Sequence, residues 1–340
     1  MKSLDQAAVD SHADSPFGPL LNAALTTIFH DDELRRQSDL TVIGPIHPNG
    51  NPMFGESFTR EQALAVRDDS LRVIQHCSSK PGLWDKCGIS PPPPDPAHLE
   101  YEVQFGSCIL VQTMVLSILH LATNGRMTPR RVWRLAMHQG FYDRHRPGFA
   151  GIDYGEVMVN GVQYPLLFPG MAWMNSQEFR LLEELGNIEA MRQVLINEGD
   201  LWLWMSPDRF PTESSLFGAA ATTFLEPSSH PRPSCLSKVA SLPLEVTIHL
   251  LSFADIPSIL SLASTSRLFH TSIFGCDALV RTWVCVNAPW YIPYSNDAAD
   301  IAAMDWAYLR RCYISPSMRN RRRIWRIVGD IERLASGLHV

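Results

Sequence analysis

The chain has 340 residues, of which 45% are hydrophobic and 19% are charged. This balance is typical of a globular protein and excludes a chain that is disordered throughout. The formal net charge of −6 disfavours a nucleic-acid-binding protein, because such domains are usually basic. The charge is uneven, since residues 305–340 contain eight arginines and only three acids.

The sequence predicts neither a secretory signal nor a membrane span. Residues 1–16 lack the apolar region of a secretory signal. The longest apolar run, residues 108–122, includes Gln112 and His120 and is too short to cross a bilayer. The seven cysteines form no CxxC pair, which is typical of reduced thiols. We therefore expect a protein of the cytoplasm or nucleus that binds neither membranes nor nucleic acids.

The N-terminal part begins with little pattern. Residues 1–55 are expected to be weakly ordered, with a loop before residue 55. From Thr59, a good N-cap, a helix is predicted that carries Leu71 and Ile74 on its apolar face and ends near residue 81. The run of prolines at 91–94 is predicted to be a stiff spacer.

Residues 56–215 are predicted to form one mixed, mostly helical domain with a small β-hairpin. A buried helix is expected over residues 105–122, and another begins after Thr128 with a proline in its first turn. The hairpin is predicted at residues 157–168, where Asn-Gly stands between alternating apolar residues. One or two further helices are expected over residues 178–199.

A linker rich in proline and serine is predicted over residues 216–238. It precedes three short helices expected within residues 239–285. In the first of them Val246, Leu250 and Phe253 form one apolar face, while Ile248 and Leu251 belong to another.

These helices carry more apolar surface than a small bundle can bury. An exposed patch of this size usually marks a protein interface. An alternative is that the same residues form an ordinary core against the N-terminal domain. The sequence alone does not separate the two faces of the helix.

Residues 242–285 resemble an F-box, the adaptor-binding module of cullin-type ubiquitin ligases. The resemblance rests on Leu242-Pro243 with Glu245, on Asp255-Ile256-Pro257, and on the run from Leu260 to Arg267. It implies that a Skp-type adaptor, which docks onto a cullin, packs against Leu242, Pro243, Ile248, Leu251, Ile259 and Leu262. The predicted partner-binding set also contains Glu245, Val246, Leu250, Ile256 and Pro257.

The order of segments is similar to that of F-box proteins of filamentous fungi with a C-terminally placed box. Residues 317–325, SMRNRRRIW, and the Asp153-Tyr154-Gly155 turn carry this looser resemblance. It implies no particular target. Three positions depart from the F-box pattern, namely Ala254, Phe269 and Val280.

The tail, residues 286–340, is predicted to end in a basic amphipathic helix. Its apolar face consists of Ile324, Val328, Ile331 and Ala335. The five arginines between residues 319 and 326 are expected to form a solvated helix start that faces acidic surface. A nuclear-import or nucleic-acid patch is the alternative.

No residue pattern predicts catalysis or a cofactor. A nucleophile elbow, HExxH, a P-loop and GxGxxG are all missing from the sequence. His76, Cys77, Cys87 and His98 fit none of the usual zinc spacings, so no metal site is expected.

The sequence favours the substrate-recruiting F-box subunit of a Skp–cullin–F-box ubiquitin ligase, which is not itself an enzyme. Its predicted partners are the Skp-type adaptor, through it a cullin, and an unknown protein substrate held by residues 56–215. The alternative is a scaffold or interaction protein, outside any ligase, whose box-like helices pack on its own N-terminal domain. The three departures from the F-box pattern motivate this alternative.

Overall fold

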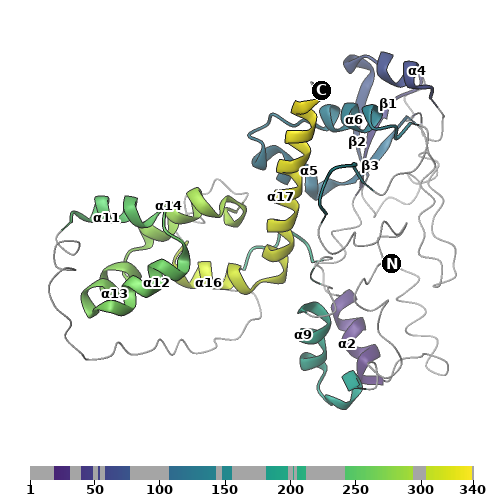
Figure 1. The fold of residues 1–340 in the computed structure, drawn as a ribbon. Coiled ribbons are helices and arrows are strands. Elements are labelled where there is room, and N and C mark those ends of the chain that lie inside the picture. Colours follow the sequence, from purple (N-terminus) through teal and green to yellow (C-terminus); the bar gives the residue numbers. More distant parts are fainter. Residues whose placement is uncertain are drawn as a thin grey trace. The chain divides into compact units, whose positions relative to one another are not determined.

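The computed structural model describes residues 19–30, 40–48, 53, 58–76, 107–142, 148–154, 181–197, 202, 205–211, 242–293 and 304–338. It is mainly helical with a small three-stranded antiparallel sheet (Figure 1). The chain divides into two compact units. Residues 1–207 with 320–340 form the sheet unit, and residues 208–319 form the helical unit.

The sheet unit contains a three-stranded sheet in the order β2-β1-β3, with both pairs antiparallel. Val42 of the central strand lies opposite Ile74 on one side and Leu110 on the other. The described residues of this unit form α2 (Pro19–His30), β1 (Leu40–Pro45), α4 (Arg60–Ala65), the 3-10 helix η2 (Asp68–Ser70), β2 (Leu71–His76), β3 (Ile109–Gln112), α5 (Thr113–Ala122), α6 (Pro129–His138), α9 (Ile188–Asn197) and most of α17 (Pro316–Gly337).

The central strand lies in a segment where the sequence shows little pattern. Within residues 1–55, expected to be weakly ordered, the structure contains both α2 and β1. Val42 and Ile43 are buried, and Gly44 lets a second segment approach, because a Cβ there would lie 2.5 Å from the sulfur of Cys108. Pairing with strands that are distant in the sequence stabilises β1. The local sequence pattern of β1 therefore does not predict a strand.

The helix predicted from Thr59 to residue 81 is wrong beyond Ala65. Thr59 is the N-cap, and it forms a capping box with Gln62. The helix then ends, and Leu71 and Ile74 belong to strand β2 instead. A spacing of three places two residues on one face of a helix but on opposite faces of a strand, so the helical pattern was misleading here. Pairing with β1 makes this segment a strand.

The buried helix predicted over residues 105–122 is also wrong in its first part. Residues 109–112 form strand β3, and only from Thr113 does the chain become helical as α5. The indole N–H of Trp133, on α6, donates to the Ser107 carbonyl at 2.6 Å. This hydrogen bond links the residues just before β3 to α6. A short apolar run cannot be assigned to strand or helix from its composition.

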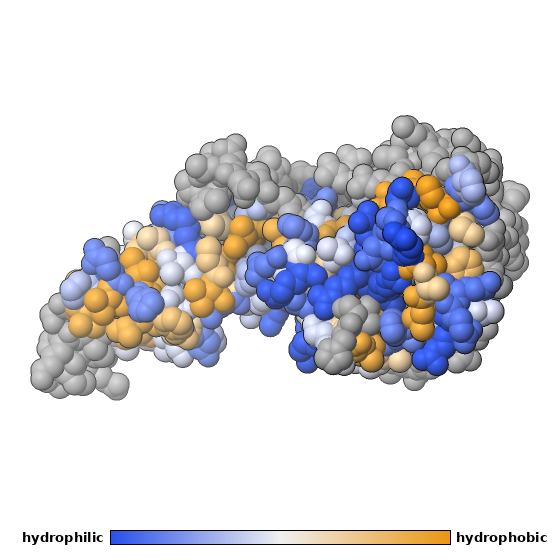
Figure 2. Space-filling model, turned by 90° about the horizontal axis from the view of Figure 1, so that it is seen from above, coloured by the Kyte–Doolittle hydropathy of each residue, from blue (hydrophilic) through white to orange (hydrophobic). Residues whose placement is uncertain are grey.

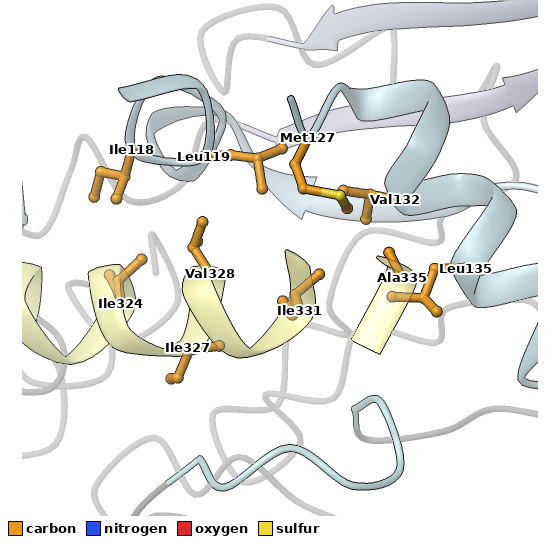
Figure 3. Packing of buried hydrophobic residues seen from close by; sticks show 10 residues of the cluster. All are labelled: Ile118, Leu119, Met127, Val132, Leu135, Ile324, Ile327, Val328, Ile331 and Ala335. Carbon is orange, nitrogen blue, oxygen red and sulfur yellow. The ribbon is translucent and has the colours of Figure 1, made fainter. Parts of the chain in front are cut away.

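Two helix predictions in this unit are confirmed. Helix α6 begins with Thr128 as N-cap, whose hydroxyl accepts from the Arg131 N–H at 3.2 Å. The predicted apolar face of α17 is buried against α5 and α6 (Figure 3). In that cluster Ile324, Val328 and Ile331 point toward Ile118, Leu119 and Met127.

The expectation of a solvated arginine segment at the start of α17 is wrong for Arg321. Its side chain is fully buried and donates to the Pro207 carbonyl at 3.2 Å. Arg323 is partly buried and donates to the Tyr154 carbonyl. Burial, with a smaller effect of neighbouring Arg326, lowers the pKa of Arg323 below its ordinary value.

The helical unit contains α11 (Leu244–Leu251), α12 (Ile256–Thr265), α13 (Arg267–Phe274), α14 (Asp277–Asn287), η7 (Pro289–Tyr291), α16 (Trp306–Ile314) and residues 316–319 of α17. The sequence predicted three helices up to residue 285, and the structure has four. The predicted third helix is divided at Gly275, where a Cβ would lie 2.7 Å from the Thr271 carbonyl oxygen.

Some predictions fall outside the described residues. These are the hairpin at 157–168, the proline spacer at 91–94 and the linker at 216–238. The strands that the structure describes come from other segments, β1, β2 and β3.

Candidate functional site

Helix α11 carries a row of exposed apolar side chains. Their exposed fractions are 36% for Leu242, 43% for Val246, 55% for Leu250 and 66% for Phe253. Val246 and Leu250 are one turn apart on the helix, whereas Leu242 lies two positions before its first residue and Phe253 two positions after its last. We call these four residues the α11 stripe. Figure 2 shows hydrophobic residues at the surface over the helices drawn green in Figure 1.

The other apolar face of α11 packs inward. Ile248 and Leu251 are partly buried and contact a core formed by Ile259, Ala263, Phe269, Ile273 and Leu279. The two faces that the sequence could not separate are thus distinct in the structure. One is covered by α12, α13 and α14, and the other faces outward.

The predicted partner-binding residues are distributed over both environments. Leu242, Pro243, Glu245, Val246, Leu250 and Pro257 are exposed, whereas Ile248, Leu251, Ile256 and Leu262 are partly buried. Ile259 is fully buried in the core. Its side chain therefore packs in the core between the helices and is not part of their exposed surface.

A pocket of about 160 Å³ opens beside α11. Its walls come from α11, α13 and the turn before α14, and Leu242, Ile248 and Leu251 belong to them. The polar groups in the walls are those of Thr247, Ser272 and Cys276. An apolar cavity of roughly 150 Å³ is large enough for a benzene-sized group. The pocket is therefore about the size of one apolar side chain.

Local hydrogen bonds fix the helices that form this surface. The carboxylate of Asp255 accepts from the Ser258 N–H at 2.8 Å and caps α12. These bonds to Ser258 hold the pKa of Asp255 below its ordinary value. The Ser266 hydroxyl caps α13 in the same way by accepting from the Phe269 N–H.

Helix α14 fastens the loop between α11 and α12. The Trp283 indole donates to the Ala254 carbonyl at 2.8 Å, and the Asn287 amide donates to the Ser252 carbonyl. Both acceptors lie just after α11 ends at Leu251. The stripe is therefore presented by a helix whose C-terminal end is held in place.

Sequence reasoning left three exposed apolar residues out of the partner-binding set. They are Phe253 in the turn after α11, Leu260 on α12, 45% exposed, and Leu268 on α13, 59% exposed. Leu268 lines the pocket. The spacing of Phe253 from Val246 and Leu250 would have placed it in the set, whereas no spacing rule distinguishes Leu260 from its buried neighbour Ile259.

The described residues provide no constellation of metal ligands. No group of three or more His, Cys, Asp or Glu side chains lies close enough within them to hold a metal ion. No helix among these residues is long and apolar enough to cross a membrane. The thiol of Cys312 is buried, which raises its pKa to about 12 and makes it a poor nucleophile.

Comparison with protein-family models, with curated proteins and with solved structures finds no significant match. The similarity to F-box sequences therefore rests on the residues named above.

Proposed function

We propose that this chain is the substrate-recruiting F-box subunit of a Skp–cullin–F-box ubiquitin ligase, with the α11 stripe and the adjacent pocket as the surface that binds the Skp-type adaptor. The observation that carries the proposal is the row of exposed apolar side chains on the helix that bears the F-box-like sequence. In this proposal residues 239–285 form the F-box, and the chain performs no chemistry of its own.

The energetics of the stripe support a binding surface. Burying an aliphatic or aromatic side chain contributes about 1.5–3 kcal/mol, so four exposed ones leave a considerable driving force for association. Such contiguous apolar surface is uncommon on a monomer that has no partner. Because α11 is held by α14, little conformational entropy opposes docking onto it.

In this proposal the chain acts by bringing a target protein close to the ubiquitin-loaded enzyme. A subunit that binds the adaptor at one surface and a target at another raises the effective concentration of the target near the ubiquitin-loaded enzyme. The adaptor surface lies in the helical unit. The sheet unit, which includes the residues 56–215 predicted to hold the substrate, is then the place to look for the target-binding surface.

A binding assay with a matched control tests the proposal. We expect purified Skp-type adaptor to bind the full chain, and the double variant Val246→Asp/Leu250→Asp to lose binding. Both residues are exposed, so the variant should fold. The control Leu181→Asp/Leu185→Asp changes two exposed leucines of the sheet unit and should bind like the wild type.

Absence of binding by folded wild-type protein would overturn the proposal. The scaffold hypothesis would then replace it. Equal loss of binding in both double variants would show that the stripe is not the contact surface.

A further inference from the structure

The sheet unit has an exposed apolar patch at the start of α9, the helix that packs against α2 (Figure 1). Leu181 and Leu185, in the turn of helix just before α9, are 55% and 46% exposed, and Ile188, the first residue of α9, is 36% exposed. Leu182 in the same turn is buried, so this segment already has an inner face. We call Leu181, Leu185 and Ile188 the α9 patch.

Three acidic residues lie in the sequence around the α9 patch, and two of them are occupied. The Glu183 carboxylate accepts from two backbone N–H groups at the start of α2, at 2.8 and 2.9 Å. Glu189 is ion-paired with Arg192 at 3.0 Å. Glu184 is exposed and makes no hydrogen bond or ion pair in the described part of the chain. The α9 patch therefore has one negative charge that is left for another molecule.

The helical unit has an exposed patch of its own at the end of α16. Tyr313 and Ile314 are 70% and 60% exposed. The core side of the helix is formed instead by Tyr308, Leu309 and Cys312, which are all buried. Tyr313 and Ile314 therefore do not serve the packing of α16 within its own unit.

Arg310 adds a positive charge beside these two side chains. It lies one helical turn before Ile314, on the same side of α16. It is exposed and, among the described residues, has neither a hydrogen bond nor an ion pair. Arg311 differs, because it donates to the Pro211 carbonyl at 3.0 Å. We call Arg310, Tyr313 and Ile314 the α16 patch, and its tyrosine and arginine are residue types that dominate the energetics of protein interfaces.

We propose that the α16 patch of one copy of this chain binds the α9 patch of a second copy. Each patch offers exposed apolar side chains next to one charge that has no partner in the described part of the chain, and the two charges are opposite. A guanidinium and a carboxylate at the edge of an apolar contact form charge-assisted hydrogen bonds. Contact of either patch with its own equivalent would bring like charges together, which is unfavourable. The interface is therefore made by two different surfaces.

A second copy is the partner that these observations identify, because the chain itself supplies both halves of the match. The patches contain only a few side chains each, and small interfaces are typical of weak, transient association. We therefore expect self-association at high protein concentration and low ionic strength, where the attraction between opposite charges is least screened. This contact goes beyond adaptor binding and does not involve the α11 stripe.

Sedimentation velocity of the full chain over a series of concentrations tests the inference by complementation. The average mass of the wild type should rise with concentration. Leu181→Asp/Leu185→Asp and Tyr313→Ser/Ile314→Ser change exposed residues and should each remain monomeric over the same series. An equimolar mixture of the two variants should associate again, because each copy supplies the patch that the other lacks.

Exchanging the two charges tests their pairing. Glu184→Arg and Arg310→Glu should each weaken self-association about tenfold, and the two substitutions in one chain should restore it. The control Arg60→Glu makes the same change of charge at another exposed position and should associate like the wild type. The stripe variant Val246→Asp/Leu250→Asp should also associate like the wild type.

The inference is overturned if the wild type keeps the mass of a monomer at every concentration. It is also overturned if the mixture of the two patch variants stays monomeric, or if the charge exchange does not restore association. Loss of association in the stripe variant would assign the contact to the α11 stripe and overturn it as well. None of these measurements contains the adaptor, so their outcome is independent of the proposed function.

Discussion

At the scale of single residues, burial distinguishes neighbours that look alike in the sequence. Ile259 and Leu260 are adjacent aliphatic residues of α12, yet one is fully buried and the other is 45% exposed. The resemblance to F-box sequences placed Ile259 in the partner-binding set, but its side chain contacts the core. The direction of a side chain depends on how the four helices pack, and this packing involves residues up to Leu279.

This difference predicts opposite outcomes for two substitutions. Ile259→Ala should lower the free energy of unfolding by about 2–4 kcal/mol, because it leaves a cavity in the core. Leu260→Ala should change it by less than about 1 kcal/mol, because the side chain is partly in water already. Urea unfolding followed by circular dichroism measures both values. Equal losses would contradict the assignment of Ile259 to the core.

Asp255 predicts a dependence of stability on pH. Its pKa is lowered in the folded protein, so its contribution to stability is present above the unfolded-state value and is lost as the pH falls through the acid range. Asp255→Asn keeps a good N-cap but removes the titrating group. The melting temperature of the wild type should therefore fall more than that of the variant between neutral and acid pH. Parallel curves for the two proteins would contradict this role.

At the scale of elements, the sequence predicted amphipathic helices well and strands poorly. The start of α6 at Thr128 and the apolar face of α17 follow from capping and from periodicity, which are local properties. Strands β1, β2 and β3 come from three distant segments, and only their pairing makes them strands. The same limit applies to the site. Periodicity found two faces on α11, but the packing of α12, α13 and α14 determines which face is covered.

Helix α17 provides a test of the part played by its glycine. Gly329→Ala should raise the free energy of unfolding by about 0.5–1 kcal/mol, because alanine favours the helix and its Cβ has room. Ala335→Gly in the same helix is the matched control, and it should destabilise the protein because Ala335 is fully buried. A loss of stability in Gly329→Ala would show that the glycine serves internal packing.

At the scale of the whole molecule, the proposed adaptor surface belongs to one of the two units. The α11 stripe lies in the helical unit, residues 208–319. A subunit that joins an adaptor to a target needs a second surface, because one protein must hold both partners at once. The account therefore predicts that exposed substitutions in the sheet unit, such as Leu181→Asp/Leu185→Asp, leave adaptor binding unchanged in a pull-down assay.

The most direct test of the central claim is hydrogen–deuterium exchange of the full chain with and without saturating Skp-type adaptor. We predict slower amide exchange on adaptor binding in α11, α12 and α13, with no change in α6. Unchanged exchange in residues 244–274 under saturating adaptor would contradict the claim that this surface binds it.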